Sequence, residues 1–127
     1  MIENIIFAMG VGRVILGVVP FVAAAESARV LGFPAEHDNP TSRLMARFFG
    51  VRDVGLGVLV FYALHHPPVL PFILLFNALT DFGDLFAIGI PLVRREGIDR
   101  AAWRSTGFAL PAGLGWLTML LLASGLG

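Results

Sequence analysis

Two carboxylates and an amide occur together in a stretch that is otherwise apolar enough to lie inside a membrane. Asn77, Asp81 and Asp84 belong to the segment FNALTDFGDLFAIGIPL, residues 76–92. Their spacing of four and then three residues places them on one face of an α-helix. Carboxyl groups held one turn apart in an apolar setting are suited to carrying and transferring protons. The segment therefore predicts an acid–base site or a proton relay within a membrane.

Three further ionisable residues interrupt apolar segments of the chain. Arg13 lies in the first such segment, and Arg52 and Asp53 are adjacent in another. A charged side chain at the bilayer centre costs about 2.5–3.5 kcal/mol, so the five charges, left unpaired, would cost roughly 12–17 kcal/mol. We therefore expect all five to face the protein interior and to meet one another or water.

The balance of these charges predicts a bound proton. Arg13 and Arg52 stand against Asp53, Asp81 and Asp84, which gives 2 − 3 = −1. Burial and a like-charged neighbour both favour the neutral form of a carboxyl group. Asp81 and Asp84, one turn apart, are predicted to share that proton, and Asp53 is predicted to be the nearest counter-charge to Arg52.

The composition assigns these residues to a membrane protein and excludes several kinds of site. The chain has 127 residues, of which 57% are hydrophobic and 14% charged, whereas a soluble domain is about half apolar and a quarter charged. Its formal net charge is zero, which gives no reason to expect a nucleic-acid partner. Without cysteine there is no thiolate or iron–sulfur site. The adjacent His65 and His66, beside two prolines, favour an interfacial position over a metal site, and no cofactor is predicted.

The chain predicts an all-α fold, an integral membrane four-helix bundle formed by a single domain, residues 1–127. A helix that crosses the bilayer needs about 20 apolar residues. Strands are not expected, because Gly and Ala are frequent, alternation is absent and an open sheet cannot span lipid. Either Asn39-Pro40 or Thr41-Ser42 supplies the start of the second helix. The predicted spans are residues 5–31, 43–64, 69–91 and 101–123.

Small residues share helix faces with the buried charges, which predicts close helix packing. Two stripes follow from helical periodicity, one in the second span and one in the first: Arg47, Gly50, Asp53 and Gly57, and Arg13, Gly17, Pro20 and Ala24. Pro20 also leaves the Leu16 carbonyl without its usual backbone donor.

Arginine is distributed unevenly between the two ends of the predicted bundle. The connections between the first and second and between the third and fourth spans are flanked by six arginines, whereas the termini and residues 65–68 carry none. Positive residues gather on the cytoplasmic side. The asymmetry predicts a multi-pass protein of the cell membrane with both termini extracytoplasmic. The six are Arg29, Arg43, Arg94, Arg95, Arg100 and Arg104.

At RLMARFFGVRDVGLGVLVFYAL the chain resembles a domain-of-unknown-function family of small four-helix membrane proteins within the DoxX-like group. GVGRVILG in the first helix and NALTDFGD in the third share this likeness, which covers nearly the whole chain. The resemblance implies four helices and a polar site around Arg52, Asp53 and Asp81, and it implies no activity.

The leading hypothesis is a membrane-embedded acid–base enzyme, an isomerase, cyclase or epoxide hydrolase, that acts on a lipophilic small molecule. One carboxyl of Asp81 and Asp84 would donate a proton, Asp53 would accept one or orient water, and Arg52 would keep the carboxylates ionised. Asn77 would position a substrate oxygen. The other residues predicted to bind the substrate are Arg13, Arg47 and Tyr62.

Three other hypotheses stay open from the sequence. The carboxylates would relay protons in a small proton-coupled transporter or channel, which needs a homodimer or a larger assembly. In an accessory subunit of a membrane complex, the charges would pair with a protein partner. Buried ion pairs that only fix helix register are the purely structural alternative.

Overall fold

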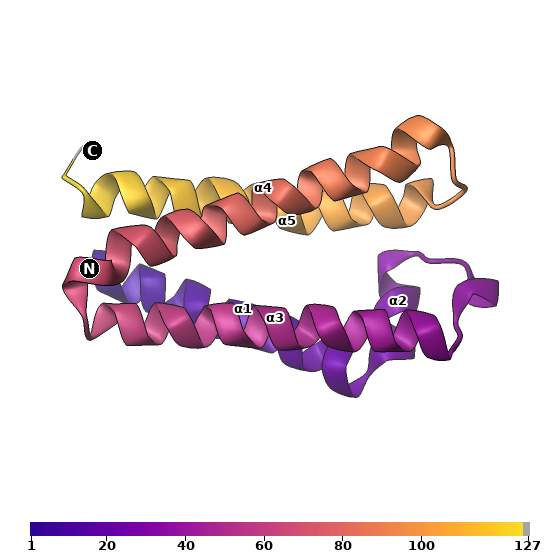
Figure 1. Ribbon diagram of the computed structural model, residues 1–127, viewed down its shortest axis with the longest axis horizontal. Coiled ribbons are helices and arrows are strands. Elements are labelled where there is room, and N and C mark those ends of the chain that lie inside the picture. The colour runs from indigo at the N-terminus through magenta and orange to yellow at the C-terminus, as the bar shows by residue number, and fades with distance from the viewer. Residues whose placement is uncertain (126–127) are drawn as a thin grey trace.

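The computed structural model describes residues 1–125, and in this part of the chain it is all-helical, as predicted. Four helices are long and one is short, so the predicted count of four helices is not confirmed (Figure 1). Two short 3-10 turns, Ala35–His37 and Pro67–Val69, lie in the connections. The helices are α1, Ile2–Val22; α2, Ala24–Leu31; α3, Pro40–Leu64; α4, Leu70–Arg94; and α5, Asp99–Ala123.

The predicted first span, residues 5–31, is divided into α1 and α2. The helix breaks at Ala23, whose backbone angles of φ −134° and ψ 58° lie outside the helical region. Pro20, three residues earlier, has no backbone N–H and so removes one hydrogen bond of the last turn. The short α2 then ends at Gly32, which has a left-handed φ of 94°.

A reciprocal cap starts α3 at the first of the two predicted positions. The Asn39 side chain accepts a hydrogen bond of 2.9 Å from the backbone N–H of Ser42, and Ser42 Oγ accepts one of 3.1 Å in return. Pro40 occupies the first helical position. Arg43 of the first turn donates two hydrogen bonds of 2.8 Å to Asp38, the residue before the cap. These hydrogen bonds hold the pKa of the Asp38 carboxyl below its usual value.

The long helices form two hairpins that lie in two layers (Figure 1). In one, α1 packs along α3, and in the other α4 packs along α5. The N-terminus and the turn between α3 and α4 lie at the same end of the molecule. The α4–α5 connection and α2 lie at the opposite end.

Glycines bring α1 and α3 into contact, as their stripes predict. A Cβ atom on Gly17 would lie 2.8 Å from the backbone nitrogen of Val54, and it would also clash with the carbonyl oxygen of Gly50. A Cβ on Gly57 would lie 2.9 Å from the carbonyl oxygen of Gly10. Real Cβ atoms are not found this close to backbone atoms, so these positions accept only glycine at this helix separation.

The two hairpins share a hydrophobic core near the end of the molecule that holds the N-terminus and the α3–α4 turn. Its residues come from all four long helices, and they lie toward the N-terminus, the α3–α4 turn and the C-terminal half of α5. Toward the other end the ribbons of α3 and α4 diverge (Figure 1). There α2 contacts α5, and Arg104 donates a hydrogen bond of 2.9 Å to the Val30 carbonyl. The core consists of Ile6, Val60, Ala63, Ile73, Leu74, Ala78, Trp116 and Met119.

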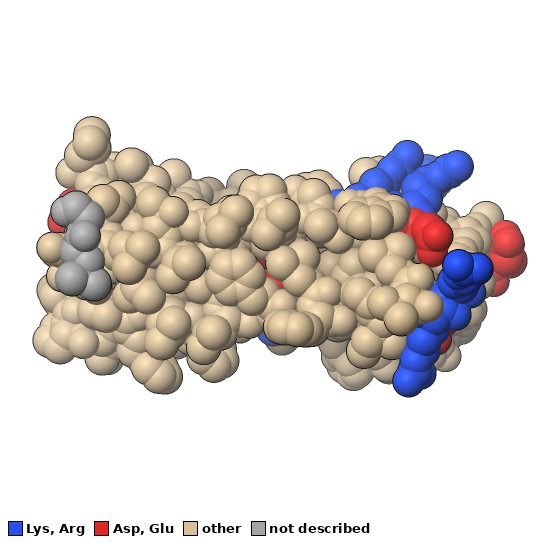
Figure 2. Space-filling model, turned by 90° about the horizontal axis from the view of Figure 1, so that it is seen from above, with Lys and Arg blue, Asp and Glu red and all other residues tan. Residues whose placement is uncertain are grey.

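The surface has the character of a membrane protein. Three of the described helical segments are long and apolar enough to cross a membrane: Ile2–Val22, Pro67–Arg94 and Asp99–Ala123. The remaining long helix, α3, has 25 residues but carries four charged residues. On the face seen in Figure 2, charged side chains gather at the end that holds α2 and the α4–α5 connection, and the middle of this face is almost wholly uncharged.

Candidate functional site

A buried ion pair joins the two hairpins at the middle of the helices. Arg13 of α1 donates hydrogen bonds from both terminal nitrogens to the carboxylate of Asp81 on α4. One of these nitrogens also lies 3.4 Å from the side-chain oxygen of Asn77. The exposed fractions are only 6% for Arg13 and 4% for Asp81. The Asn77 amide nitrogen donates in turn a 2.9 Å hydrogen bond to the Ile73 carbonyl, so each of the three side chains in this buried group is hydrogen-bonded.

A second ion pair joins the hairpins on the more open side of the cluster. Arg52 of α3 donates hydrogen bonds of 2.9 and 2.8 Å to the two oxygens of Asp84 on α4. This bidentate geometry is the strongest that an arginine and a carboxylate adopt. The side chains of Arg52 and Asp84 are 37% and 25% exposed. Phe49 covers part of the guanidinium, with 4.7 Å between the Arg52 Cζ atom and the ring centroid.

Asp53 is the third carboxylate of the cluster and has no arginine of its own. Only 4% of its surface is exposed. Its Oδ1 atom accepts two long hydrogen bonds of 3.3 and 3.4 Å from Arg52, which is already engaged with Asp84. Among residues 1–125, no hydrogen bond is donated to the second oxygen, Oδ2. Asp53 is therefore the surplus carboxyl group of the cluster.

This pairing corrects two predictions about the carboxylates. Asp84, not Asp53, is the principal counter-charge of Arg52. Within the described chain Asp81 and Asp84 are not hydrogen-bonded to each other, and each binds a different arginine. The physical reason is that α1 and α3 lie side by side opposite α4. One helix face of α4 therefore meets two arginines from two neighbouring helices.

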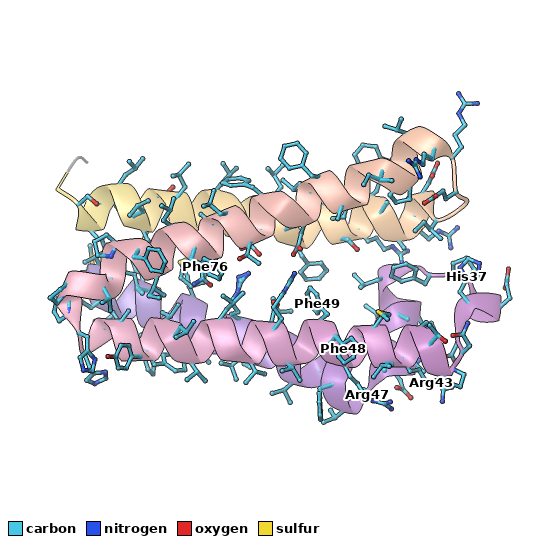
Figure 3. All side chains as sticks on the ribbon, viewed as in Figure 1. His37, Arg43, Arg47, Phe48, Phe49 and Phe76 are labelled. Atoms are coloured by element: carbon cyan, nitrogen blue, oxygen red, sulfur yellow. The ribbon has the colours of Figure 1, made fainter. Side chains whose placement is uncertain are left out.

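Two of the predicted substrate-binding residues lie away from the cluster. Arg47 is exposed, and Figure 3 shows it on the side of α3 that faces away from α4. Tyr62 is 53% exposed and stacks on His66, with ring centroids 3.9 Å apart, near the α3–α4 turn. The predicted stripe placed Arg47 in line with Asp53, but the close contact of α1 with α3 at Gly50 and Gly57 fills that face with backbone. The other six predicted site residues are together: Arg13, Arg52, Asp53, Asn77, Asp81 and Asp84.

Two aromatic residues complete the site and were not predicted. Phe49 extends from α3 toward the other hairpin (Figure 3). Trp116 of α5 is 2% exposed, and its ring centroid lies 5.7 Å from the Arg13 Cζ atom. Aromatic residues recur throughout this apolar chain, so sequence spacing alone gave no signal that these two contact arginines.

Outside this cluster, a site could also be formed by a group of metal ligands or by a surface hollow of the described residues. In the part of the chain that the structure describes, no three of His, Cys, Asp and Glu are grouped as metal ligands. A hollow of about 390 Å³ is lined by Phe82, Leu85 and Phe86. A second, of about 270 Å³, lies between α1 and α3 and is also lined by apolar side chains. Both are hollows for hydrocarbon rather than for a polar molecule.

Comparisons with known proteins place the chain in a family without assigning an activity. No curated protein and no solved structure matches it. The resemblance to the DoxX-like group is not confirmed, whereas the resemblance to a family of unknown function is. The match covers residues 10–126 and so contains all five charges of the cluster. The chain belongs to the family described as Domain of unknown function (DUF4267).

Proposed function

We propose that this protein crosses the cell membrane with all four long helices, and that its buried cluster is an acid–base site for a lipophilic small molecule. The single observation that carries the proposal is the surplus carboxyl group, Asp53, held nearly out of contact with the surroundings beside two satisfied arginine–carboxylate pairs. Ionisable residues within membrane segments mark functional sites by default.

The crossing of α3 follows from the path of the chain. The helix α1 ends at one end of the molecule and α4 begins at the other, and α3 is the element that runs between them (Figure 1). If α1 and α4 span the bilayer, α3 spans it too. Its charges at mid-length are then tolerated because Asp53 is buried and Arg52 is paired with Asp84 of α4.

In the proposed mechanism Asp53 is the residue that carries the exchangeable proton. Two guanidinium groups balance two of the three carboxylates, and a proton on Asp53 makes the whole cluster neutral. The acid would give this proton to an oxygen or an alkene carbon of the substrate and become a carboxylate. Loss of a proton from another atom of the substrate restores the acid. The substrate returns the proton that it receives, so this cycle consumes no other reactant, which is the form of an isomerisation or a cyclisation.

The two arginine pairs take different parts in this proposal. Arg13, Asn77 and Asp81 are closed off, so they hold the hairpins together and position the acid. Arg52 and Asp84 are partly exposed, so they can contact a polar group of a substrate that enters from the bilayer. If this pair holds the polar group of the substrate in one orientation, it determines which substrate atom lies next to Asp53.

A proton-coupled carrier is the second candidate, and the partial exposure of Arg52 and Asp84 at mid-length favours it. Charges at this depth need a polar neighbour, which a second copy of the chain would provide. In that case Asp53 would bind and release protons from alternate sides of the membrane rather than transfer them to a substrate.

Exchange of hydrogen between solvent and a lipophilic substrate tests the enzyme directly. The purified protein would be reconstituted into vesicles made from the total lipid extract of its host and incubated in deuterated water. Mass spectrometry of the extract should then find one compound class that gains deuterium with the parent protein and with Asp99→Asn, an exposed control position. Asp53→Asn should abolish the gain. Equal labelling by the parent and Asp53→Asn would overturn the proposal.

A further inference from the structure

We propose that the site takes a lipophilic cation, an ammonium or a comparable onium group on an apolar body, which binds at Asp53 in exchange for its proton. The inference rests on the proposed function, because both assign the exchangeable charge to Asp53. It goes further by naming the chemical class of the ligand.

The charge of the cluster carries the inference. Arg13 is matched by Asp81 and Arg52 by Asp84, so an ionised Asp53 leaves one negative charge in the middle of the bundle. Only a proton or another positive charge can neutralise it in place. An anionic ligand would have to displace Asp84 from a bidentate pair and would add charge of the wrong sign.

None of the described charged groups around Asp53 binds its Oδ2 atom, which is where we place the cation. From its own helix it meets Arg52, whose hydrogen bonds to it are long. The charged side chains of the neighbouring helices are Arg13 on α1 and Asp81 and Asp84 on α4. Each of these is engaged in its own pair, and Oδ2 of Asp53 receives no hydrogen bond from the described residues. A cation at Oδ2 would therefore complete the cluster without breaking either pair.

The surroundings suit a cation with an apolar body. The Phe49 ring is 41% exposed and already lies over the Arg52 guanidinium, so its face is oriented toward positive charge. Arg52 and Asp84 lie beside this ring at the middle of their helices and are partly exposed. A small hydrated ion would gain nothing from the aromatic ring or from the bilayer around the helices, whereas a lipophilic cation reaches this position through the bilayer.

Equilibrium dialysis with two probes of equal size and opposite charge tests the inference. The protein would be placed in phosphatidylcholine nanodiscs, with empty nanodiscs as the blank, and offered tetraphenylphosphonium or tetraphenylborate. The phosphonium should bind above the blank and the borate should not. The affinity for the phosphonium should fall by about tenfold per pH unit once the pH is low enough for Asp53 to be protonated in the free protein. Binding should also release protons into a weakly buffered solution.

Two variants separate a specific site from partition into the nanodisc. Asp53→Asn keeps two balanced arginine–carboxylate pairs, so it should fold, and it should lose phosphonium affinity by about tenfold or more. Asp99→Asn lies at an exposed position and should bind like the parent. Equal binding of both probes, or an affinity that ignores pH and Asp53→Asn, would overturn the inference.

Failure of this inference is distinguishable from failure of the proposed function. If deuterium exchange depends on Asp53 but the phosphonium does not bind, the acid–base site stands and its ligand is not cationic. If the phosphonium binds in a pH-dependent way and no compound gains deuterium, the exchange of proton and cation stands without an enzyme.

Discussion

At the residue scale, the two ion pairs of the cluster differ in burial and in what each arginine retains when its carboxylate is lost. Arg13 and Asp81 have side chains that are 5% and 6% exposed, whereas Arg52 and Asp84 are several times more exposed. Breaking a buried pair leaves an uncompensated charge, which costs about 3–5 kcal/mol. Arg52 differs from Arg13 in having a second carboxylate, Asp53, hydrogen-bonded to it.

The first prediction is that Asp81→Asn and Asp84→Asn differ in stability. Asp81→Asn should lower the free energy of unfolding by about 3–5 kcal/mol, because no other carboxylate of residues 1–125 is hydrogen-bonded to Arg13 and its remaining hydrogen bond is the long one to Asn77. Asp84→Asn should cost clearly less, because Arg52 is next to Asp53 and can pair with it. Unfolding in mixed detergent micelles measures both. Equal losses for the two variants would show that Asp53 does not compensate for the loss of Asp84, contrary to this prediction.

Helical periodicity could predict that these charges face inward, but it could not predict how they pair. The spacing of Asn77, Asp81 and Asp84 placed them on one helix face, and the structure has them there. Which arginine meets which carboxylate depends on the lateral order of the helices, and no pattern within one helix contains that order. The assignment of the surplus carboxyl to Asp53 therefore needed the structure.

At the element scale, the α1–α3 hairpin depends on backbone contact between glycines. A Cβ on Gly50 would meet the Gly17 carbonyl oxygen and lie 3.1 Å from the Phe21 Cβ. Such overpacking in a tight interface costs about 1–3 kcal/mol. Gly55, on the same helix, has no atom within 4 Å of the position that a Cβ would occupy.

The second prediction is that Gly50→Ala and Gly55→Ala have opposite effects. Gly50→Ala should destabilise the protein by about 1–3 kcal/mol as α1 and α3 are forced apart. Gly55→Ala should leave stability unchanged or raise it, because Ala is the better helix former by up to about 1 kcal/mol. Thermal unfolding of both variants in one detergent provides the comparison. A destabilised Gly55→Ala protein with an unaffected Gly50→Ala protein would contradict the packing described here.

The glycine stripes were predictable because small residues at helical spacing are a direct signature of close packing. The break between α1 and α2 was not, because the apolar run of residues 5–31 continues through it. Pro20 indicates a lost hydrogen bond, but Pro111 lies in the middle of α5 without ending it. The short α2 contacts α1, α3 and α5, and no pattern within the first apolar segment contains these tertiary contacts.

At the scale of the whole molecule, the two ends differ in charge. The connections at the α2 end are flanked by arginine, and Figure 2 shows this end as the charged one. The positive-inside rule then predicts that this end faces the cytoplasm. Met1 and the end of α5 at Ala123 would face the other side, since they lie at the opposite end of the bundle (Figure 1).

The third prediction concerns this orientation, and the absence of native cysteine makes it simple to measure. Glu3→Cys should react with a membrane-impermeant maleimide in intact cells. Glu96→Cys, in the α4–α5 connection, should react only after the cells are made permeable. The reverse pattern would invert the topology, and labelling of both in intact cells would show that the helices do not cross as proposed.

The central claim is that Asp53 carries a proton while Asp81 and Asp84 do not, and infrared spectroscopy tests it most directly. A protonated carboxyl group absorbs at a carbonyl frequency distinct from that of a carboxylate. At neutral pH, the protein in a detergent without ester groups should show this carboxylic-acid band, and Asp99→Asn should keep it. In Asp53→Asn the band should be absent. A band that persists in Asp53→Asn and is lost in Asp81→Asn or Asp84→Asn would contradict the account and return the proton to those two carboxylates.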